Sequence, residues 1–347
     1  MYSPHLSRIE AMNLRIEVRL VLTLLLIFWQ TGCSIRSQAC ADEASPKFSK
    51  TTYTYKTVEE LNIQADVYRH TDAVRRPVIV WLHGGALIMG SRSGVPMQLR
   101  TLAQEQGFLL VSLGYRLAPE TQLPEIVEDV KDGLEWVQET GPELFDADSS
   151  RLVVAGASAG GYLALMSGIV SDPAPTAIVS YWGFGDVDGD WTTQPAAAYR
   201  KGKLIDRDAA WSGVGSQALT SANKENGRGR ATFFLYLKQT GRWVNAVSGF
   251  DPKIDRDKLT PFCPIRNLSA EYPPTLMLHG TADNDVPVGQ SFAMAGELKR
   301  LGVSHELITI EGGGHSLWGG DRKLIDQAFA RSMEYIREHL ETPSAAN

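Results

Sequence analysis

Short, continuous apolar runs recur along the chain and predict buried strands. Val78–Leu82 is a run of β-branched and large apolar residues, the pattern of a strand that is buried on both faces. The same character recurs later in the chain, in Phe108–Leu113, Leu152–Ala155, Ala177–Ser180, Thr275–Leu278 and Leu307–Ile310. Near the start, Tyr53–Tyr55 and Ile63–Tyr68 predict two short edge strands, separated by a turn at 60–62.

Helical periodicity fills the segments between these runs. One helical face collects apolar residues at intervals of three and four, at Ile126, Val130, Leu134 and Val137. Further helices are predicted from Ala293 to Leu301 and from Leu324 to Ile336. Strands that alternate with helices predict an α/β fold with a mostly parallel sheet, flanked by helices and joined by right-handed crossovers.

The alternation stops between residues 182 and 272. This stretch has aromatic residues, glycines and charges but no run typical of a buried strand. A gap of this length inside a compact domain is rarely a plain loop. We therefore expect a partly helical, cap-like insertion over 182–272, placed before the strand at 275–278. It would divide the α/β core into 42–181 and 273–347, and its tryptophans would pack within the cap or line a pocket.

The N-terminus has the pattern of an export signal. Basic residues precede the apolar stretch Leu20–Trp29, and Ala39-Cys40-Ala41 fits the small-x-small cleavage rule. This pattern predicts a signal peptide over 1–41 and an exported protein, periplasmic or secreted. An alternative cleavage site at Thr31-Gly32-Cys33 would leave a lipid anchor on Cys33. We favour soluble release, because Gln30 stands where that signal normally has an aliphatic residue.

The position of signal-peptide cleavage also determines which cysteines remain in the mature chain. Cleavage after Ala41 leaves Cys263 as the remaining cysteine, so no intramolecular disulfide could form. If Cys33 and Cys40 were retained, a bridge between Cys40 and Cys263 would be conceivable.

The composition is that of a globular protein. The chain has 347 residues, of which 43% are hydrophobic, and a formal net charge of -6. No long basic run is present, which argues against a nucleic-acid partner. The N-terminal apolar stretch is shorter than the roughly twenty residues that a membrane span needs. We expect no nucleic-acid partner and no membrane span, and the oligomeric state stays open.

A serine stands in a glycine-rich turn directly after a predicted strand. Gly156-Ala157-Ser158-Ala159-Gly160 follows the strand at 152–155 and precedes the apolar helical stretch Tyr162–Val170. In this strand–turn–helix context the G-x-S-x-G motif raises a serine hydroxyl above the sheet edge, and its glycines avoid clashes. The N-terminus of the following helix favours negative charge that develops there. Ser158 is therefore the candidate nucleophile.

A serine nucleophile needs a general base, and His315 is the candidate. In this arrangement the acid and then the histidine follow the nucleophile along the chain. His279 ends a buried strand and is expected to be structural, His305 begins a strand, and His339 lies in the last helix. Only His315 follows a strand in a glycine-rich loop, 311–315, from which it could reach over the sheet edge.

The acid that orients the base is expected after the strand at 275–278. Two aspartates lie in that loop, and Asp283 fits a G-x-x-D-x-x-V-P spacing. We predict Asp283 as the acid. Asp285 is the alternative, and it could instead orient the loop or cap the helix that follows.

Backbone N–H groups are expected to form an oxyanion hole beside the serine. Ala159, directly after Ser158, supplies one donor. The second is expected from His83-Gly84-Gly85, directly after the strand at 78–82, where Gly84 or Gly85 lets the backbone approach closely. His83 is expected to fix this loop rather than to take part in catalysis.

These motifs together resemble those of a known superfamily. His83-Gly84-Gly85, Tyr115–Glu120 and Gly156–Gly160 resemble the hormone-sensitive-lipase-like esterases of the α/β-hydrolase superfamily. The segments around Asp283 and His315 also resemble its dienelactone-hydrolase and prolyl-oligopeptidase side. The resemblance runs from about residue 50 to the C-terminus, apart from the insertion. It implies the α/β-hydrolase fold and a serine esterase of the carboxylesterase kind.

The chain also departs from the pattern of these relatives. Ala86 stands where they usually have a third glycine, and Gly114 stands where an aspartate commonly precedes the Tyr-Arg-Leu-Ala-Pro segment. The resemblance implies that Arg116 and Glu120 are scaffold residues. Because of these departures, the subfamily and the substrate are left open by the resemblance.

We therefore expect an exported serine hydrolase that cleaves carboxylic esters, with a small-molecule or carbohydrate ester as substrate. Short-acyl and carbohydrate-linked esters are the classes that we favour, and no cofactor or metal is needed. A serine peptidase or amidase with the same residues is the first alternative, and a non-catalytic binding protein on the same scaffold is the second. The aspartates at 186–190 invite a calcium hypothesis, but Ala197 stands where an EF-hand loop needs glutamate, so we predict a polar loop.

Overall fold

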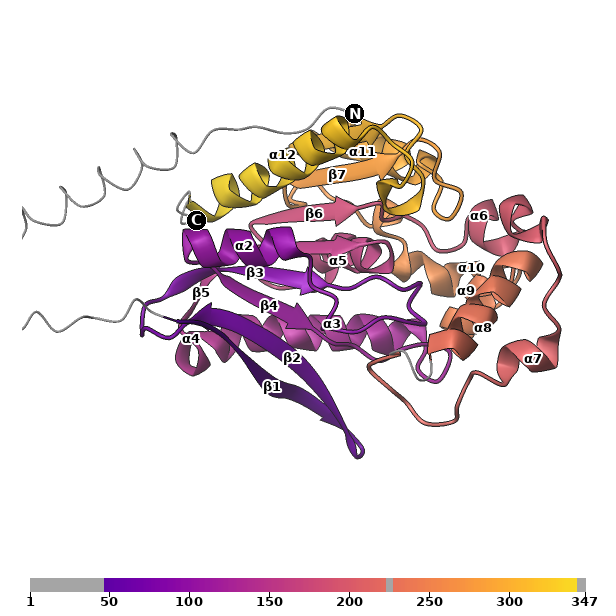
Figure 1. Ribbon diagram of the computed structural model, residues 1–347, viewed down its shortest axis with the longest axis horizontal. Coiled ribbons are helices and arrows are strands. Elements are labelled where there is room, and N and C mark those ends of the chain that lie inside the picture. The colour runs from indigo at the N-terminus through magenta and orange to yellow at the C-terminus, as the bar shows by residue number, and fades with distance from the viewer. Residues whose placement is uncertain (1–46, 223–226, 342–347) are drawn as a thin grey trace, which may run out of the picture. The chain divides into compact units, whose positions relative to one another are not determined.

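A mixed eight-stranded sheet forms the centre of the part of the chain that the structure describes. The computed structural model describes residues 47–222 and 227–341 (Figure 1). Side by side, the strands are β1 (Phe48–Val58), β2 (Leu61–His70), β4 (Leu109–Leu113), β3 (Arg76–Leu82), β5 (Ala147–Ala157), β6 (Ala177–Tyr181), β7 (Thr275–Gly280) and β8 (His305–Ile310). β2 is antiparallel to β1 and to β4, and every other pair is parallel. The predicted α/β architecture, with a mostly parallel sheet, is confirmed.

The central strands follow the apolar runs, while the first two differ from expectation. β4, β6 and β7 are buried at every position, as continuous apolar runs predict. β1 and β2 are longer than predicted, and their turn lies at 59–60. β2 is also not an edge strand, because it lies between β1 and β4. Its partner β4 is more than forty positions further along the chain, so a local pattern could not show this pairing.

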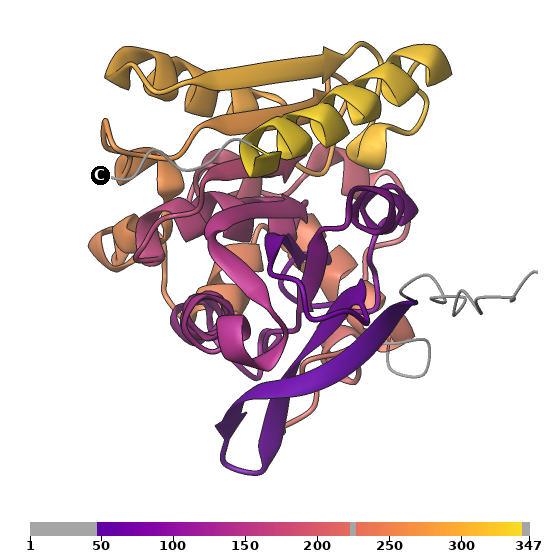
Figure 2. The same cartoon turned by 90° about the vertical axis from the view of Figure 1, so that its left-hand side faces the viewer.

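Helices cover both faces of the sheet (Figure 2). Val78, Val80 and Leu82 of β3 pack in one cluster with α3 (Leu123–Glu139), α5 (Ala159–Val170) and α11 (Gly289–Leu301). Ile79 and Trp81 point the other way and pack with α2 (Met97–Gln106) and α12 (Arg322–Glu341). Successive side chains of a strand alternate between faces, so one apolar run supplies both halves of the core. The short α4 (Gly141–Leu144) follows α3.

In its described residues, the segment between β6 and β7 is built mainly from helices. They are α6 (Asp190–Thr193), η1 (Ala197–Arg200), α7 (Arg207–Trp211), α8 (Gly227–Thr240), α9 (Trp243–Ser248), α10 (Arg256–Leu259), η2 (Thr260–Phe262) and η3 (Pro264–Arg266). Its described residues contain no strand beyond an isolated bridge between Ala222 and Gly90. These helices lie beyond the carboxyl ends of the parallel strands (Figure 1). We refer to residues 182–272 as the cap segment.

A buried arginine ties the cap segment to the loops of the core. Arg230, in α8, is 2% exposed. Its guanidinium donates to the carbonyl oxygens of Ile88 at 3.0 Å and Ala118 at 2.7 Å, and to Oε1 of Glu120 at 2.5 Å. The same carboxylate oxygen accepts from the N–H of Gly215. Glu120 therefore joins the core to the cap segment as a scaffold residue, and Arg230 is its partner.

Arg116 is held by a second buried ion pair. Its Nε and Nη2 donate to the two oxygens of Asp129 at 2.7 and 2.8 Å, and its backbone N–H donates to the same carboxylate. The side chain of Asp129, on α3, is fully buried, and Lys56 of β1 lies 2.8 Å from it. The carboxylate thus links α3 to the loop after β4 and to the edge strand.

This arrangement predicts a large loss of stability for Asp129→Ala. Removing one partner of a buried pair leaves an uncompensated cation, which destabilises by about 3–5 kcal/mol. Urea unfolding followed by circular dichroism measures the change. Glu128→Ala is the matched control on the same helix, because the side chain of Glu128 is about half exposed and forms a surface ion pair with Lys131 at 3.6 Å. Similar losses for both variants would contradict the role assigned to Asp129.

The predicted signal peptide, both candidate cleavage sites, Cys33 and Cys40 lie outside the described residues. Cys263 is a buried free thiol. Within 47–222 and 227–341, no helix is long and apolar enough to span a membrane.

Candidate active site

Ser158 lies at a sharp turn between β5, which ends at Ala157, and α5, which begins at Ala159. Its φ of 57° is in the left-handed region, which is strained for a residue with a side chain. The turn closes because its neighbours lack side chains. A Cβ on Gly156 would lie 2.1 Å from the oxygen of Gly160, and one on Gly160 would lie 2.0 Å from the oxygen of Leu82. Both glycines of the motif are therefore required by packing.

Three of the predicted residues form one chain of hydrogen bonds. Oγ of Ser158 lies 3.0 Å from Nε2 of His315, and Nδ1 of His315 lies 2.8 Å from Oδ2 of Asp283. The three come from the β5–α5 turn, the loop after β8 and the loop after β7. Parallel strands end at the same edge of the sheet, which is why residues far apart in sequence meet there.

Asp283 is 7% exposed and is held in place from several sides. Its Oδ1 accepts the backbone N–H groups of Asp285 and Val286 at 2.8 and 2.9 Å. His279 is fully buried, and its Nε2 lies 3.3 Å from Oδ2 of Asp283. Burial raises the pKa of Asp283, but hydrogen bonds from His279 and His315 outweigh it, and the pKa falls well below its usual range. Asp283 is thus a fixed negative charge on the Nδ1 side of His315.

Asp285 occupies a different position from Asp283. Its Oδ2 lies 3.7 Å from Nε2 of His315, on the side of the ring that faces the serine. Its Oδ1 pairs with Lys238 of α8 at 3.2 Å. The hypothesis that Asp285 caps the following helix is wrong, because α11 begins two residues after Pro287 and has no side-chain cap. The geometry assigns the Nδ1 contact to Asp283 and leaves Asp285 beside the reactive nitrogen.

The loop after β3 passes directly beside the Ser158 turn. A Cβ on Gly84 would lie 2.7 Å from the oxygen of Ala157 and 3.3 Å from the Cβ of Ser158. Gly85 has a φ of 123°, and Ala86, where relatives usually have glycine, also has a positive φ of 57°. The close approach at Gly84 and the open φ at Gly85 explain the two glycines. The N–H groups of Gly84, Gly85 and Ala159 remain the predicted donors of the oxyanion hole.

His83 holds this loop in place through stacking and hydrogen bonds. Its ring stacks on Tyr115, with centroids 4.2 Å apart and an interplanar angle of 8°. Nδ1 of His83 donates to the oxygen of Gly84 at 2.8 Å, and the hydroxyl of Tyr115 donates to the oxygen of His83 at 2.6 Å. Burial lowers the pKa of His83 to about 4, so the ring is neutral at ordinary pH.

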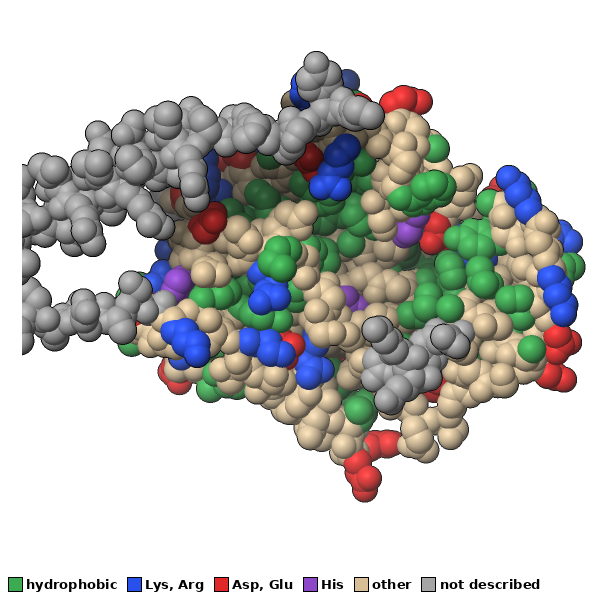
Figure 3. Space-filling model, viewed as in Figure 1, with side chains coloured by type: hydrophobic (Ala, Val, Ile, Leu, Met, Phe, Trp, Pro, Cys, Tyr) green, Lys and Arg blue, Asp and Glu red, His purple; other side chains and the backbone are tan. Residues whose placement is uncertain are grey.

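A small pocket opens beside Ser158. Its volume is about 20 Å³, and its wall is formed by Ala86, Phe184, Trp191, Phe234, Lys238, Trp243, Asp285 and Val286. Phe184, Trp191 and Trp243 contact one another edge-on or tilted, with centroids 5.0 to 6.1 Å apart. Nε1 of Trp243 donates to the oxygen of Ala86 at 3.1 Å, which joins this aromatic wall to the loop after β3. Hydrophobic side chains also gather on the surface of the cap segment (Figure 3).

Sequence reasoning missed two residues of this wall, Phe234 and Lys238. Both lie on α8, where an apolar run from Ala231 to Leu237 is bounded by Arg230 and Lys238. Nothing in this local pattern indicates that either side chain reaches the pocket. Trp182, the first residue of the cap segment, does not line this pocket, and its ring packs roughly perpendicular to that of His315, with centroids 6.4 Å apart.

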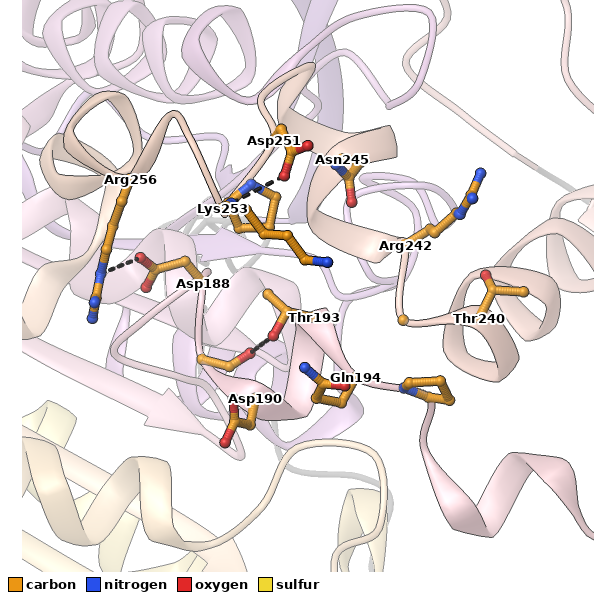
Figure 4. Close-up of a pocket in the computed structure, with 14 residues that line it drawn as sticks. Asp188, Asp190, Thr193, Gln194, Thr240, Arg242, Asn245, Asp251, Lys253 and Arg256 are labelled. Carbon is orange, nitrogen blue, oxygen red and sulfur yellow. Dashed lines mark hydrogen bonds and ion pairs between the residues drawn. The ribbon is translucent and has the colours of Figure 1, made fainter.

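A larger hollow, of about 810 Å³, lies elsewhere in the cap segment (Figure 4). It is lined by polar residues of α6, the start of α9 and 251–256, and Ser158 does not reach it. Asp188, part of the calcium hypothesis, pairs there with Arg256 and with Arg266. Asp186 accepts hydrogen bonds from Trp191 and Gln290. Over the described ranges, no cluster of three or more histidine, cysteine, aspartate or glutamate residues could hold a metal ion.

A family model described as BD-FAE matches residues 65–298, more than half of the chain. The chain belongs to the BD-FAE family. This match spans the Ser158 turn, the cap segment and Asp283, and it ends before His315.

Solved structures share the α/β-hydrolase fold. A Staphylococcus aureus protein of unknown function aligns with a TM-score of 0.68 over 84% of this chain and 99% of its own, at 19% identity. Esterase 2 of Thermogutta terrifontis aligns with a TM-score of 0.56 over 84% and 96%, at 21% identity. A carbohydrate esterase from gut microbiota gives 0.58 over 86% and 100%, at 19% identity. At these identities the likeness establishes the fold.

Among curated proteins, fungal polyketide synthases are similar to this chain. The non-reducing polyketide synthase prhL of Penicillium brasilianum is 28% identical over 341 residues, which cover 83% of this chain and 14% of that protein. The synthase trt4 of Aspergillus terreus is 28% identical over 329 residues. The chain therefore spans only about a seventh of the length of these relatives.

The charges around His315 predict its pH behaviour. Burial lowers the pKa of His315, but the hydrogen bond to Asp283 and the charges of Asp285 and Asp283 outweigh it, and the pKa lies above the ordinary 6.5. A general base must be neutral, so activity is lost as the pH falls through this pKa. We expect kcat/KM for an ester substrate to reach half its plateau above pH 6.5.

The variant Asp283→Asn tests whether Asp283, and not Asp285, is the acid that orients His315. Loss of the carboxylate on Nδ1 is expected to lower kcat by about ten-thousandfold, because the imidazole then takes the wrong tautomer. It should also move the acidic limb to lower pH, since a charge that raises the pKa of His315 is gone. A variant that keeps wild-type kcat would contradict the assignment of Asp283.

Proposed function

We propose that this protein is a serine hydrolase that cleaves carboxylic esters with a short acyl group. The observation that carries the proposal is the continuous chain of contacts from Ser158 through His315 to Asp283, at a strained turn above the sheet edge. These are the nucleophile, base and orienting acid that acyl transfer requires. Membership of the BD-FAE family and esterases among proteins of the same fold support it.

The geometry gives each residue a role. Oγ of Ser158 attacks the ester carbonyl while Nε2 of His315 takes its proton, and Asp283 stabilises the imidazolium on the other side of the ring. The oxyanion is held by the N–H of Ala159 together with that of Gly84 or Gly85. His315 then gives its proton to the departing alcohol, which leaves an acyl group on Ser158. A water molecule, deprotonated by His315, then attacks this acyl group. The bond to Oγ of Ser158 breaks, His315 returns the proton to Oγ, and the carboxylic acid leaves.

The size of the pocket supports a short acyl group. The cavity beside Ser158 is small, about 20 Å³, and the aromatic rings of Phe184, Trp191 and Trp243 form part of its wall. The wall contains the ion pair of Lys238 and Asp285, whose charges a long alkyl chain would have to desolvate. Thermogutta terrifontis esterase 2, which shares this fold, has been solved with propionate and with butyrate bound. We therefore propose acetyl esters as the preferred substrates.

We also propose that the alcohol partner is a sugar and that the mature chain is exported. The carbohydrate esterase of the same fold supports a sugar as the alcohol partner. The N-terminal pattern supports export of the mature chain. Peptidase or amidase activity is the alternative, since the same three residues serve both reactions.

The first experiment compares the mature protein with Ser158→Ala on p-nitrophenyl esters from acetyl to decanoyl. We expect the highest kcat/KM with acetyl and a loss of at least about ten-thousandfold in the variant. Ser167→Ala is the matched control, because Ser167 lies on the same helix α5 and its hydroxyl donates to the backbone oxygen of Ala164. Wild-type protein that is inactive on all esters but cleaves peptide or amide substrates would overturn the esterase proposal.

Phe234→Ala tests which wall limits the acyl chain. Phe234 lines the pocket, and removing its ring should favour longer chains by about tenfold in the octanoyl-to-acetyl ratio of kcat/KM. Phe292→Ala is the control, because Phe292 is 52% exposed on α11 and does not line the pocket. An unchanged ratio in the Phe234 variant would mean that the acyl chain does not enter this pocket.

A further inference from the structure

A buried lysine beside Ser158 has no role in the steps described above. Lys238, on α8, is 4% exposed and forms part of the wall of the pocket that Ser158 opens into. Lysine is almost never so deeply buried without a partner, because removing an ammonium group from water is costly. The partners of its ammonium group therefore indicate the role of Lys238.

Lys238 is directed at Asp285 from between two aromatic rings. Its Nζ donates to the backbone oxygen of Asp285 at 2.8 Å and lies 3.2 Å from Oδ1 of the same residue. The ring centroids of Trp191 and Tyr199 are 5.2 and 5.6 Å from Nζ, within the range of cation–π attraction. Backbone and side chain of Asp285 are thus fixed by one ammonium group.

Asp285 in turn faces the reactive nitrogen of the base. Its Oδ2 lies 3.7 Å from Nε2 of His315, and the same nitrogen is 3.0 Å from Oγ of Ser158. Once His315 has taken the serine proton, that proton is on Nε2 and must pass to the departing alcohol. A free carboxylate at this position would attract the imidazolium. It would also accept a hydrogen bond from Nε2–H of His315, in competition with the departing alcohol.

We propose that Lys238 is a positioning residue that holds Asp285 off His315, so that Nε2 stays available to Ser158 and to the leaving alcohol. This inference rests on the proposed serine hydrolase function. The charged groups around His315 are consistent with it. The charges of Asp285 and Asp283 raise the pKa of His315, and the charge of Lys238 lowers it. Tyr199 also faces Asp285, and burial followed by the charge of Asp285 raises the pKa of its hydroxyl.

The test is the pH profile of kcat/KM for p-nitrophenyl acetate in a set of variants. Lys238→Met should move the acidic limb to higher pH by about one pH unit, because the carboxylate of Asp285 then acts on His315 without its counter-charge. Lys238→Arg keeps the charge and should hold the limb within about 0.3 pH unit of wild type. Asp285→Asn should move the limb in the opposite direction, to lower pH.

The double variant distinguishes an action through Asp285 from a direct effect of the cation. In the Asp285→Asn background, Lys238→Met should shift the limb by less than about half as much as in the wild-type background. Lys258→Met, an exposed lysine of the cap segment, is the matched control and should leave the limb unchanged.

Equal shifts in both backgrounds, or no shift for Lys238→Met, would overturn the inference. If Lys238→Met does not fold, Asp285→Asn and Lys238→Arg still decide it, and an unmoved limb in Asp285→Asn refutes it. These failures are distinct from failure of the proposed function. A dead Ser158→Ala variant with unmoved limbs in the other variants removes only the role of Lys238, whereas an active Ser158→Ala variant removes the proposed function itself.

Discussion

Ser158 is the single residue between the end of β5 at Ala157 and the start of α5 at Ala159. Its left-handed φ is tolerated because Gly156 and Gly160 let the turn close against the oxygen of Leu82, where any side chain would collide. Strain of this kind costs about 1–3 kcal/mol and persists only when its surroundings fix it. Here the buried parallel strands β3 and β6 on either side of β5 provide the support. The position of the hydroxyl, and so every distance in the site, depends on this packing.

Two buried ion pairs hold the loops near the Ser158 turn in place. Asp129 holds the loop after β4 against α3 and the edge strand, and Arg230 joins α8 to the loop after β3 and to Glu120. The oxygen of Ile88, which Arg230 contacts, is only a few positions beyond Gly84 and Gly85. The cap segment therefore does more than cover the sheet edge, since one of its buried charges fixes the loop that passes beside Ser158.

The electrostatics of the site follow from three charges around one imidazole. Asp283 is fixed on Nδ1 by backbone N–H groups and by His279, while Asp285 lies beside Nε2 and is paired with Lys238. Two carboxylates near one histidine act in the same direction on its pKa, and a lysine from the cap segment opposes the second. Core loops supply the carboxylates and the cap segment supplies the cation. The protonation of His315 therefore depends on how the cap segment packs against the core.

The sequence by itself determined the features that local patterns encode. Continuous apolar runs gave the buried strands, and G-x-S-x-G at a strand–helix junction located Ser158. Chain order and glycine content then singled out His315 and favoured Asp283 over Asp285, and the structure brings these residues together as expected. Only the tertiary structure decided that β2 is an inner strand, that Asp285 lies on the Nε2 side of His315, and that Lys238 and Phe234 reach the pocket. These facts depend on contacts between residues tens of positions apart, and no local periodicity records which distant charge a buried side chain will meet.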